Sequence, residues 1–236
     1  MNTALLKLRT TRTPWAAAGV IVAAAAAVLA LNAALLGRPG QPALTPEVLV
    51  DLVRAPGRLT GAAALLFGLL LTTSEYRHGT ALSSRLVQPR TTVRLLGAAV
   101  AAAVAGAVLA GIVTVLMLGG SAAILASADL AVEPFRHGTP AAVAALVVTA
   151  ALHGIAGVGL GELLRNPAAA VGVVLGWIFV VEGIVPVVLR QPDFGRWLPG
   201  GAIQSALEPS VGGVALLAVY AVAVLALGGL RASRDA

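Results

Sequence analysis

The sequence contains no cysteine and a single lysine among its 236 residues. Without cysteine the chain can form no disulfide, thiolate metal site, iron–sulfur cluster or thiol nucleophile. The lysine, Lys7, follows no glycine-rich turn, whereas a Walker A loop needs a Lys after such a turn to reach the β- and γ-phosphates of ATP. The sequence therefore excludes a Walker-type ATPase on this polypeptide, and we expect this chain to bind no cofactor.

Charged residues are also scarce, at 11% of the chain, while 58% of its residues are apolar. Soluble domains carry about 25% charged residues, so the composition predicts a membrane protein. A transmembrane helix needs about 20 mostly apolar residues, and six segments meet this requirement. Their long unbroken runs do not fit the alternating strands of about 10 residues in a β-barrel. The six segments are residues 14–36, 58–73, 93–126, 139–163, 167–189 and 212–231.

We therefore predict an all-α membrane protein, with six transmembrane helices in a single domain over residues 1–236. The second segment is short unless its helix continues past Thr73. The third is long enough to tilt, or to break near Gly119. Pro167 suits the first position of the fifth helix, directly after a tight turn.

Basic residues divide unequally between the two sets of connecting segments. Cytoplasmic loops of membrane proteins carry the excess of Lys and Arg, so the set with ten basic and three acidic residues should be cytoplasmic, both termini included. The other set has six of each sign. The basic excess therefore reflects membrane topology and is not a nucleic-acid signature. The ten basic residues are Lys7, Arg9, Arg12, Arg77, Arg85, Arg90, Arg94, Arg165, Arg231 and Arg234.

Two outer segments are broken by proline. The prolines in residues 37–57 predict a conformationally restricted outer loop with one short helix around Pro46 to Arg54. Residues 190–211 contain Phe194 and Trp197 in a partly apolar loop, which suggests a re-entrant or interfacial piece against the outer face. The low lysine content, with abundant Ala, Arg and Gly, is compatible with a GC-rich bacterial genome, so we expect a multi-pass protein of the bacterial plasma membrane.

The connection between the second and third spans, residues 74–90, is the most informative stretch. It begins where a span leaves the bilayer, and Leu82 and Leu86 lie at i, i+4 on one helical face. Gly79 as a breaker and Pro89 as a stop would bound a short helix on the cytoplasmic surface. A positively charged loop held to anionic headgroups is the alternative.

Residues 75–80, Glu-Tyr-Arg-His-Gly-Thr, followed by a small amphipathic stretch and Pro89-Arg90, resemble the signature after the second span of ABC-2 type transporter permeases. The six spans and the cytoplasmic termini extend the resemblance over nearly the whole chain. In that family the stretch is a coupling helix that docks on a separate ATPase subunit, and two permeases, as a homodimer or heterodimer, pair with two ATPases. Family members often place a Lys near the start of the third span, where this chain has Arg94.

The resemblance implies that ATP and Mg are bound by the partner and that this chain is not itself an enzyme. It implies that residues of the motif contact the ATPase and that the chain turns sharply at Gly79 where the second span ends. It also implies that Leu82 and Leu86 pack in a groove on the ATPase surface. The residues that it assigns to coupling are Glu75, Tyr76, Arg77, His78, Gly79, Thr80, Leu82 and Leu86.

Two ionisable residues, His153 and Glu182, fall within predicted spans, where such groups are costly and are candidates for function. Either could bind substrate or carry protons. Otherwise Glu182 reaches the outer interface or pairs with Arg190 or Arg58, and His153 is a neutral core histidine. The three histidines form no metal-binding motif, so we expect no metal site.

The leading hypothesis is the transmembrane subunit of an ATP-binding cassette exporter. Its almost wholly apolar spans would suit a hydrophobic drug, an antibiotic or a lipid as substrate. An autonomous six-span carrier or channel that uses Glu182 and His153 is the alternative. A membrane-embedded enzyme or an anchor for a cytoplasmic partner forms a third class.

Overall fold

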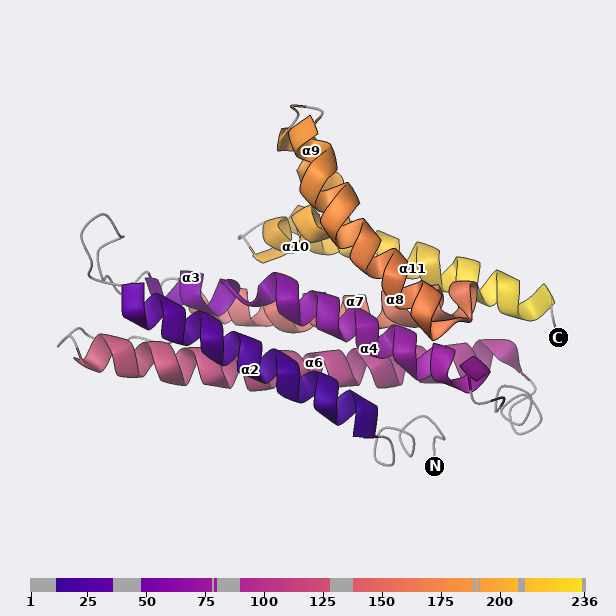
Figure 1. Cartoon of the computed structure of the whole chain (residues 1–236), viewed down its shortest axis with the longest axis horizontal. Helices are drawn as coiled ribbons and strands as arrows, with labels where there is room; N and C mark the ends of the chain where they lie inside the picture. The colour runs from indigo at the N-terminus through magenta and orange to yellow at the C-terminus, as the bar shows by residue number, and fades with distance from the viewer. Residues whose placement is uncertain are drawn as a thin grey trace.

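The structure, a computed structural model, describes residues 12–35, 48–77, 79, 90–127, 138–188, 190, 192–207 and 211–234. Within these residues every regular element is a helix (Figure 1), in agreement with the predicted all-α class. The elements are α2 (Arg12–Leu35), α3 (Val48–Arg54), α4 (Gly57–Arg77), α6 (Thr91–Ser127), α7 (Thr139–Leu164), α8 (Pro167–Gly176), the π-helix η1 (Trp177–Ile184), α9 (Val185–Val188), the 3₁₀-helix η2 (Pro192–Trp197), α10 (Pro199–Leu207) and α11 (Val211–Arg234).

Five stretches are long and apolar enough to cross a membrane, which indicates a multi-pass membrane protein. The helix predicted as the first span, α2, is not among the five, so the count of six stays a prediction. The five stretches are Val50–Arg77, Thr91–Ser127, Thr139–Leu164, Pro167–Ile184 and Gly212–Arg234.

The helix boundaries answer the questions that the sequence left open. The second predicted span continues past Thr73 to Arg77, which gives α4 a length of 21 residues. The third is one continuous helix of 37 residues with no break at Gly119. At 1.5 Å per residue, α6 is about 55 Å long, so it exceeds the hydrocarbon thickness and must tilt or project beyond it. The short helix expected in the first outer segment is α3.

The turn between α7 and α8 forms as its residue types predict. Arg165 adopts a left-handed conformation with φ 56°, and its N–H bonds to the carbonyl of Gly161, which ends α7. The side chain of Asn166 then accepts the N–H groups of Ala168 and Ala169 at the start of α8. Pro167 takes the first helical position, where a missing N–H costs nothing.

Helix α7 lies at the centre of the bundle, and its glycines bring three neighbours to backbone contact. A Cβ atom built on Gly154 would lie 2.5 Å from the carbonyl oxygen of Ala102 in α6, and one on Gly159 would lie 2.6 Å from that of Val224 in α11. A Cβ on Gly157 would collide with the carbonyl of Leu65 in α4. Small residues allow such close approach of helices in lipid, so α4, α6, α7 and α11 form one tightly closed unit.

The segment after α7 departs from this unit. Helix α8 still packs Ala170 and Val174 against Leu69 of α4, and in Figure 1 the segment of η1 and α9 that follows rises away from the long helices at an angle. No residue of η1 is buried, and Phe179 is 69% exposed. By contrast, α10 returns to the bundle, because Ala202 and Ile203 pack in one cluster with Leu146 of α7. The predicted re-entrant segment therefore packs on the helices themselves.

We predict that Gly157→Ala destabilises the protein, because the added methyl group has no space beside the carbonyl of Leu65. Overpacking of this kind typically costs about 1–3 kcal/mol. Gly111→Ala in α6 is the matched control, since a Cβ there meets nothing within 4 Å. Thermal unfolding in detergent should show a lower midpoint for Gly157→Ala alone. Equal midpoints for the two variants would contradict the close contact of α4 and α7.

Candidate functional site

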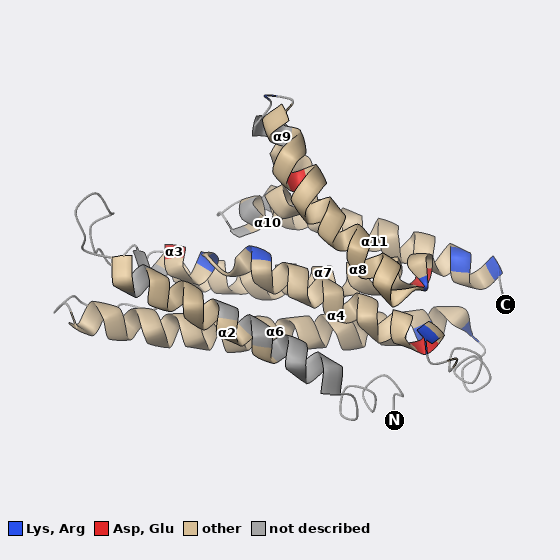
Figure 2. Ribbon diagram, in the orientation of Figure 1, with Lys and Arg blue, Asp and Glu red and all other residues tan. Residues whose placement is uncertain are grey.

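Charged residues are sparse along the bundle, and several basic ones lie at the end where α11 finishes (Figure 2). The last turn of α11 carries Arg231 and Arg234. The guanidinium of Arg165, just after α7, lies 3.4 Å from the carbonyl oxygen of Arg231. Arg94, in the first turn of α6, bonds to the last turn of α7 through Glu162. Residues predicted as cytoplasmic from separate loops therefore meet at one end of the molecule.

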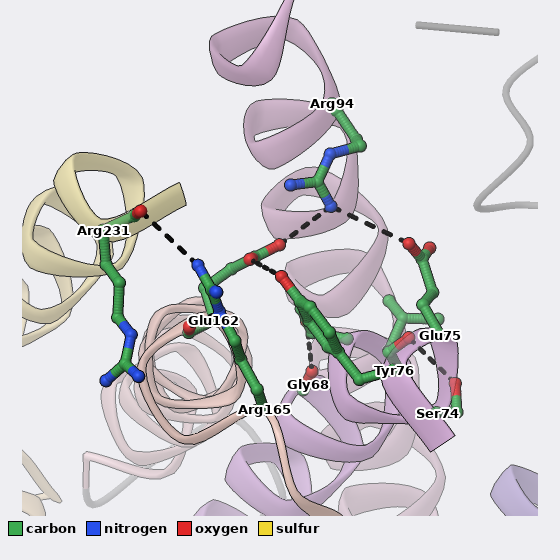
Figure 3. A network of polar contacts seen from close by, with 10 residues as sticks. Gly68, Ser74, Glu75, Tyr76, Arg94, Glu162, Arg165 and Arg231 are labelled. Carbon is green, nitrogen blue, oxygen red and sulfur yellow. Dashed lines mark hydrogen bonds and ion pairs between the residues drawn. The ribbon is translucent and has the colours of Figure 1, made fainter. Parts of the chain in front are cut away.

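A buried carboxylate, Glu162, is the centre of this end (Figure 3). It is 1% exposed. Its Oε1 accepts a hydrogen bond from Nη1 of Arg94 at 2.9 Å, and its Oε2 accepts one from the hydroxyl of Tyr76 at 2.6 Å. One side chain of α7 thus binds the start of α6 and the end of α4.

A second carboxylate shares the same guanidinium. Nη1 of Arg94 also lies 3.7 Å from Oε2 of Glu75, and the two side chains are only 11% and 13% exposed. The guanidinium of Arg165 stands 5.4 Å from the centre of the Tyr76 ring, in cation–π geometry. These five residues and Arg231, whose carbonyl binds Arg165, are called the inner network: Glu75, Tyr76, Arg94, Glu162, Arg165 and Arg231.

The inner network joins the ends of four helices: α4, α6, α7 and α11. A buried ion pair contributes little net stability compared with apolar packing, but removing one partner leaves an uncompensated charge and costs about 3–5 kcal/mol. The positions of Arg94 and Tyr76 are therefore dictated by Glu162. A displacement of the last turn of α4 must be transmitted to the other three helices or break these contacts.

The residues predicted to couple to an ATPase divide into two groups. Glu75 and Tyr76 face Arg94 and Glu162 within the chain, as Figure 3 shows. Arg77 and Gly79 are exposed. Gly79 has φ 66°, a left-handed conformation that favours glycine, and its N–H bonds to the carbonyl of Tyr76. This geometry agrees with its predicted place as the breaker after the second span. The remaining predicted residues, His78, Thr80, Leu82 and Leu86, lie outside the described residues.

The second predicted intramembrane residue, Glu182, lies in the π-helix η1. Its Oε1 accepts the indole N–H of Trp177 at 3.0 Å. A π-helix closes its hydrogen bonds between residues i and i+5, so it brings Trp177 and Glu182 onto one face, which an α-helix would not do. The same Oε1 accepts the backbone N–H of Gly200 at 2.9 Å.

Glu182 therefore caps the first turn of α10 from a neighbouring helix. A carboxylate is favourable there because the first N–H groups of a helix lack partners and carry positive partial charge. Neither Arg58 nor Arg190 forms an ion pair with Glu182, so both predicted pairings are wrong. Trp177 and Glu182 are five residues apart in the sequence. This spacing predicts a contact only if the segment is known to be a π-helix.

His153 is 5% exposed and lies where α4, α7 and α10 meet. Its Nδ1 is 2.7 Å from the carbonyl oxygen of Thr149, one turn earlier in α7. A Cβ atom on Gly61 of α4 would lie 3.5 Å from that nitrogen and 3.1 Å from Ile203 of α10. His153 is thus a packed, hydrogen-bonded core residue. Among the described residues, no three His, Asp or Glu side chains gather as a metal site would require.

The sequence analysis did not single out Glu162 as a candidate, although the structure places it at the centre of the inner network. The signal was present, because the predicted fourth span of residues 139–163 contains this acid, and an acid within a span is a functional candidate by default.

No family model matches the chain, and no curated protein matches it either.

We predict that Glu162→Ala lowers the free energy of unfolding by about 3–5 kcal/mol, because Arg94 then stays buried without its nearest carboxylate. Asp51→Ala is the matched control. Asp51 pairs with Arg54 at 3.7 Å, but its side chain is 79% exposed. Exposed pairs contribute about 0–1 kcal/mol. Denaturant titration in detergent should separate the two variants, and losses of the same size would refute the buried network.

We predict that Glu182→Gln is mild and that Glu182→Leu is disruptive. Gln keeps an oxygen that can accept the N–H groups of Trp177 and Gly200, whereas Leu leaves both donors unpaired at a cost of about 1–3 kcal/mol. Unfolding of both variants in detergent checks this. If Gln and Leu destabilise the protein equally, the negative charge itself is required and the capping explanation fails.

Proposed function

We propose that the chain is the transmembrane subunit of an ATP-binding cassette exporter of the ABC-2 type, driven by a separate ATPase subunit that binds ATP and Mg. One observation carries this proposal. The last turn of α4, which begins the Glu75–Thr80 motif, is held by Arg94 and Glu162 to the central helix α7. The motif that resembles the family's ATPase-binding signature therefore starts at the helix end that is bonded to α6 and α7. A force applied to this motif would act directly on the helix bundle.

The membrane arrangement in this proposal has six spans, with α2 as the first, and both termini in the cytoplasm of a bacterium. The charge distribution supports it, because Arg94, Arg165 and Arg231 converge at one end and positive residues favour the cytoplasmic side. The segment after α4 then emerges on the same side as the ATPase.

The division of the motif suggests how force is transmitted. Arg77 and Gly79 are exposed and are placed to meet the partner, whereas Glu75 and Tyr76 face inward. Closure of the ATPase dimer would push the segment that follows α4. The inner network would carry this displacement to α6, α7 and α11 as a rigid body, which is a recurrent mode of switching between two states.

The substrate pathway in this proposal runs between two permeases, in a homodimer or a heterodimer. Backbone contacts of Gly154, Gly157 and Gly159 close α7 against its three neighbours, which leaves no room for a pathway along those faces. The exposed apolar surface of the chain, including Phe179, suits a hydrophobic drug, an antibiotic or a lipid.

The alternative function, an autonomous carrier or channel, depends on Glu182 and His153. Both side chains bond to groups that fix helices, Glu182 to the start of α10 and His153 to the carbonyl of Thr149. No observation on the described residues favours this alternative over the exporter subunit.

The proposal predicts that a photoreactive maleimide on Arg77→Cys cross-links the chain to an ATPase. The chain has no native cysteine, so each variant carries a single thiol. Arg58→Cys is the matched control, since Arg58 is exposed on the same helix at its opposite end. In native membranes, mass spectrometry should identify a Walker-type ATPase cross-linked to the Arg77→Cys variant only.

The same pair of variants tests the orientation. A membrane-impermeant maleimide should label Arg58→Cys in intact cells and Arg77→Cys only after permeabilisation. Labelling of Arg77→Cys in intact cells would reverse the proposed topology. Absence of any ATPase among the cross-linked proteins, with efficient labelling of the thiol, would refute the exporter assignment.

A further inference from the structure

The π-helix η1 lies in the predicted fifth span, which is attached to the bundle at two places. Before η1, Ala170 and Val174 of α8 pack against Leu69 of α4. Near the end of η1, the carboxylate of Glu182 accepts the backbone N–H of Gly200 in α10. Helix α10 itself packs in a buried cluster with α4, α6, α7 and α11. The register of η1 therefore decides whether both attachments can be made at once.

The side chains of η1 are hardly fixed by packing. None of its eight residues is buried, and Val180 is 52% exposed. Ile178 packs partly against the cluster around Leu69. A Cβ atom on Gly176, directly before η1, would meet nothing within 4 Å. A rotation of η1 about its axis would therefore exchange mainly lipid contacts and would leave the buried clusters intact.

The backbone of η1 can be satisfied in two hydrogen-bond registers. The N–H of Val185 bonds to the carbonyl of Val180, five residues earlier, whereas in an α-helix it would bond to Val181. A bilayer requires that backbone groups find partners within the helix, and both registers supply them. Pro186 has no N–H, so the carbonyl of Glu182 lacks its α-helical donor. One bond that would favour the α register is thus missing.

The two registers differ in what Glu182 can reach. Its bond to the indole of Trp177 spans five residues, which lie on one face only with π-helical bonding. In an α-helix five residues turn through about 500°, which leaves the two side chains about 140° apart. If α8 stays packed on α4, the same change turns Glu182 away from Gly200. Both hydrogen bonds of its Oε1 therefore depend on the π register.

We propose that η1 is a register latch. In the π form Glu182 ties the fifth span to α10, and conversion of η1 to an α-helix releases α10 from this span. The inner end of the span is placed to drive the conversion, because α8 begins two residues after Arg165, whose guanidinium stands over the Tyr76 ring. This use in transport rests on the proposed function, whereas the two registers themselves require no ATPase.

Fluorine NMR of the purified chain in lipid nanodiscs, with 5-fluorotryptophan in place of tryptophan, tests the latch. The chain has three tryptophans, and Trp15→Phe and Trp197→Phe identify the lines of the other two. Trp177 should give two lines, bonded and released, or one line broadened by their exchange. Glu182→Gln should shift the bonded line only, because its acceptor changes from a carboxylate to an amide. A single sharp Trp177 line, or an equal shift of both lines, would overturn the proposal.

Deletion of Val180 should lock the latch. It places Trp177 and the carboxylate of Glu182 four residues apart, so an ordinary α-helix puts them on one face. The deletion should leave one Trp177 line near the bonded position, while Val180→Ala, the matched control that keeps the residue count, should retain two. Two lines in both variants would overturn the register assignment. Equal unfolding midpoints exclude misfolding as the cause, and if the deletion variant unfolds earlier, the Glu182→Gln comparison decides.

Nucleotide trapped on the ATPase of the purified complex separates the latch from the exporter proposal. Trapping should change the ratio of the two Trp177 lines by about twofold or more. An unchanged ratio would overturn the role of the latch in transport. The exporter assignment would then still be tested separately, by the cross-linking of the Arg77→Cys variant to an ATPase.

Discussion

The arrangement of the bundle end where α4 and α7 finish and α6 begins depends on one carboxylate, Glu162, held inside a bundle of apolar helices. A charge in that position must have partners, and Arg94 and Tyr76 provide them from the two neighbouring helices. Those contacts are reachable only because glycines on α7 let α4 and α6 approach to backbone distance. Close packing and buried charge therefore act together: the packing brings the groups within bonding distance, and the charge fixes which helix ends meet.

The two ends of the bundle are held by different chemistry. The inner network contains ionic contacts between three helices, α4, α6 and α7, with one guanidinium shared between two carboxylates, and α11 joins it through the carbonyl of Arg231. At the other end, Glu182 accepts two neutral N–H groups and joins the π-helix η1 to α10. The first arrangement resists displacement of one helix relative to the others. The second fixes a short returning helix against a segment that otherwise leaves the bundle.

Much of the fold was predictable, because apolar length and turn chemistry are local properties. The four-residue extension of α4 past Thr73 and the start of α8 at Pro167 follow from helix continuity and capping. The site was predictable only in part. The sequence marked the Glu75–Thr80 motif and Arg94, but it did not pair them with Glu162, which lies 68 residues beyond Arg94. The π-helix was also missed, because neither composition nor hydrophobic period distinguishes it from an α-helix.

The central claim is that ATP bound by a partner moves this chain through its inner end. The most direct measurement is the distance between spin labels on Arg234→Cys in the two permeases of the purified complex, since Arg234 is exposed in the last turn of α11. Trapping nucleotide on the ATPase should shift the distance distribution, and Tyr76→Phe, which removes one bond to Glu162, should reduce that shift. Identical distributions with and without trapped nucleotide would contradict the account.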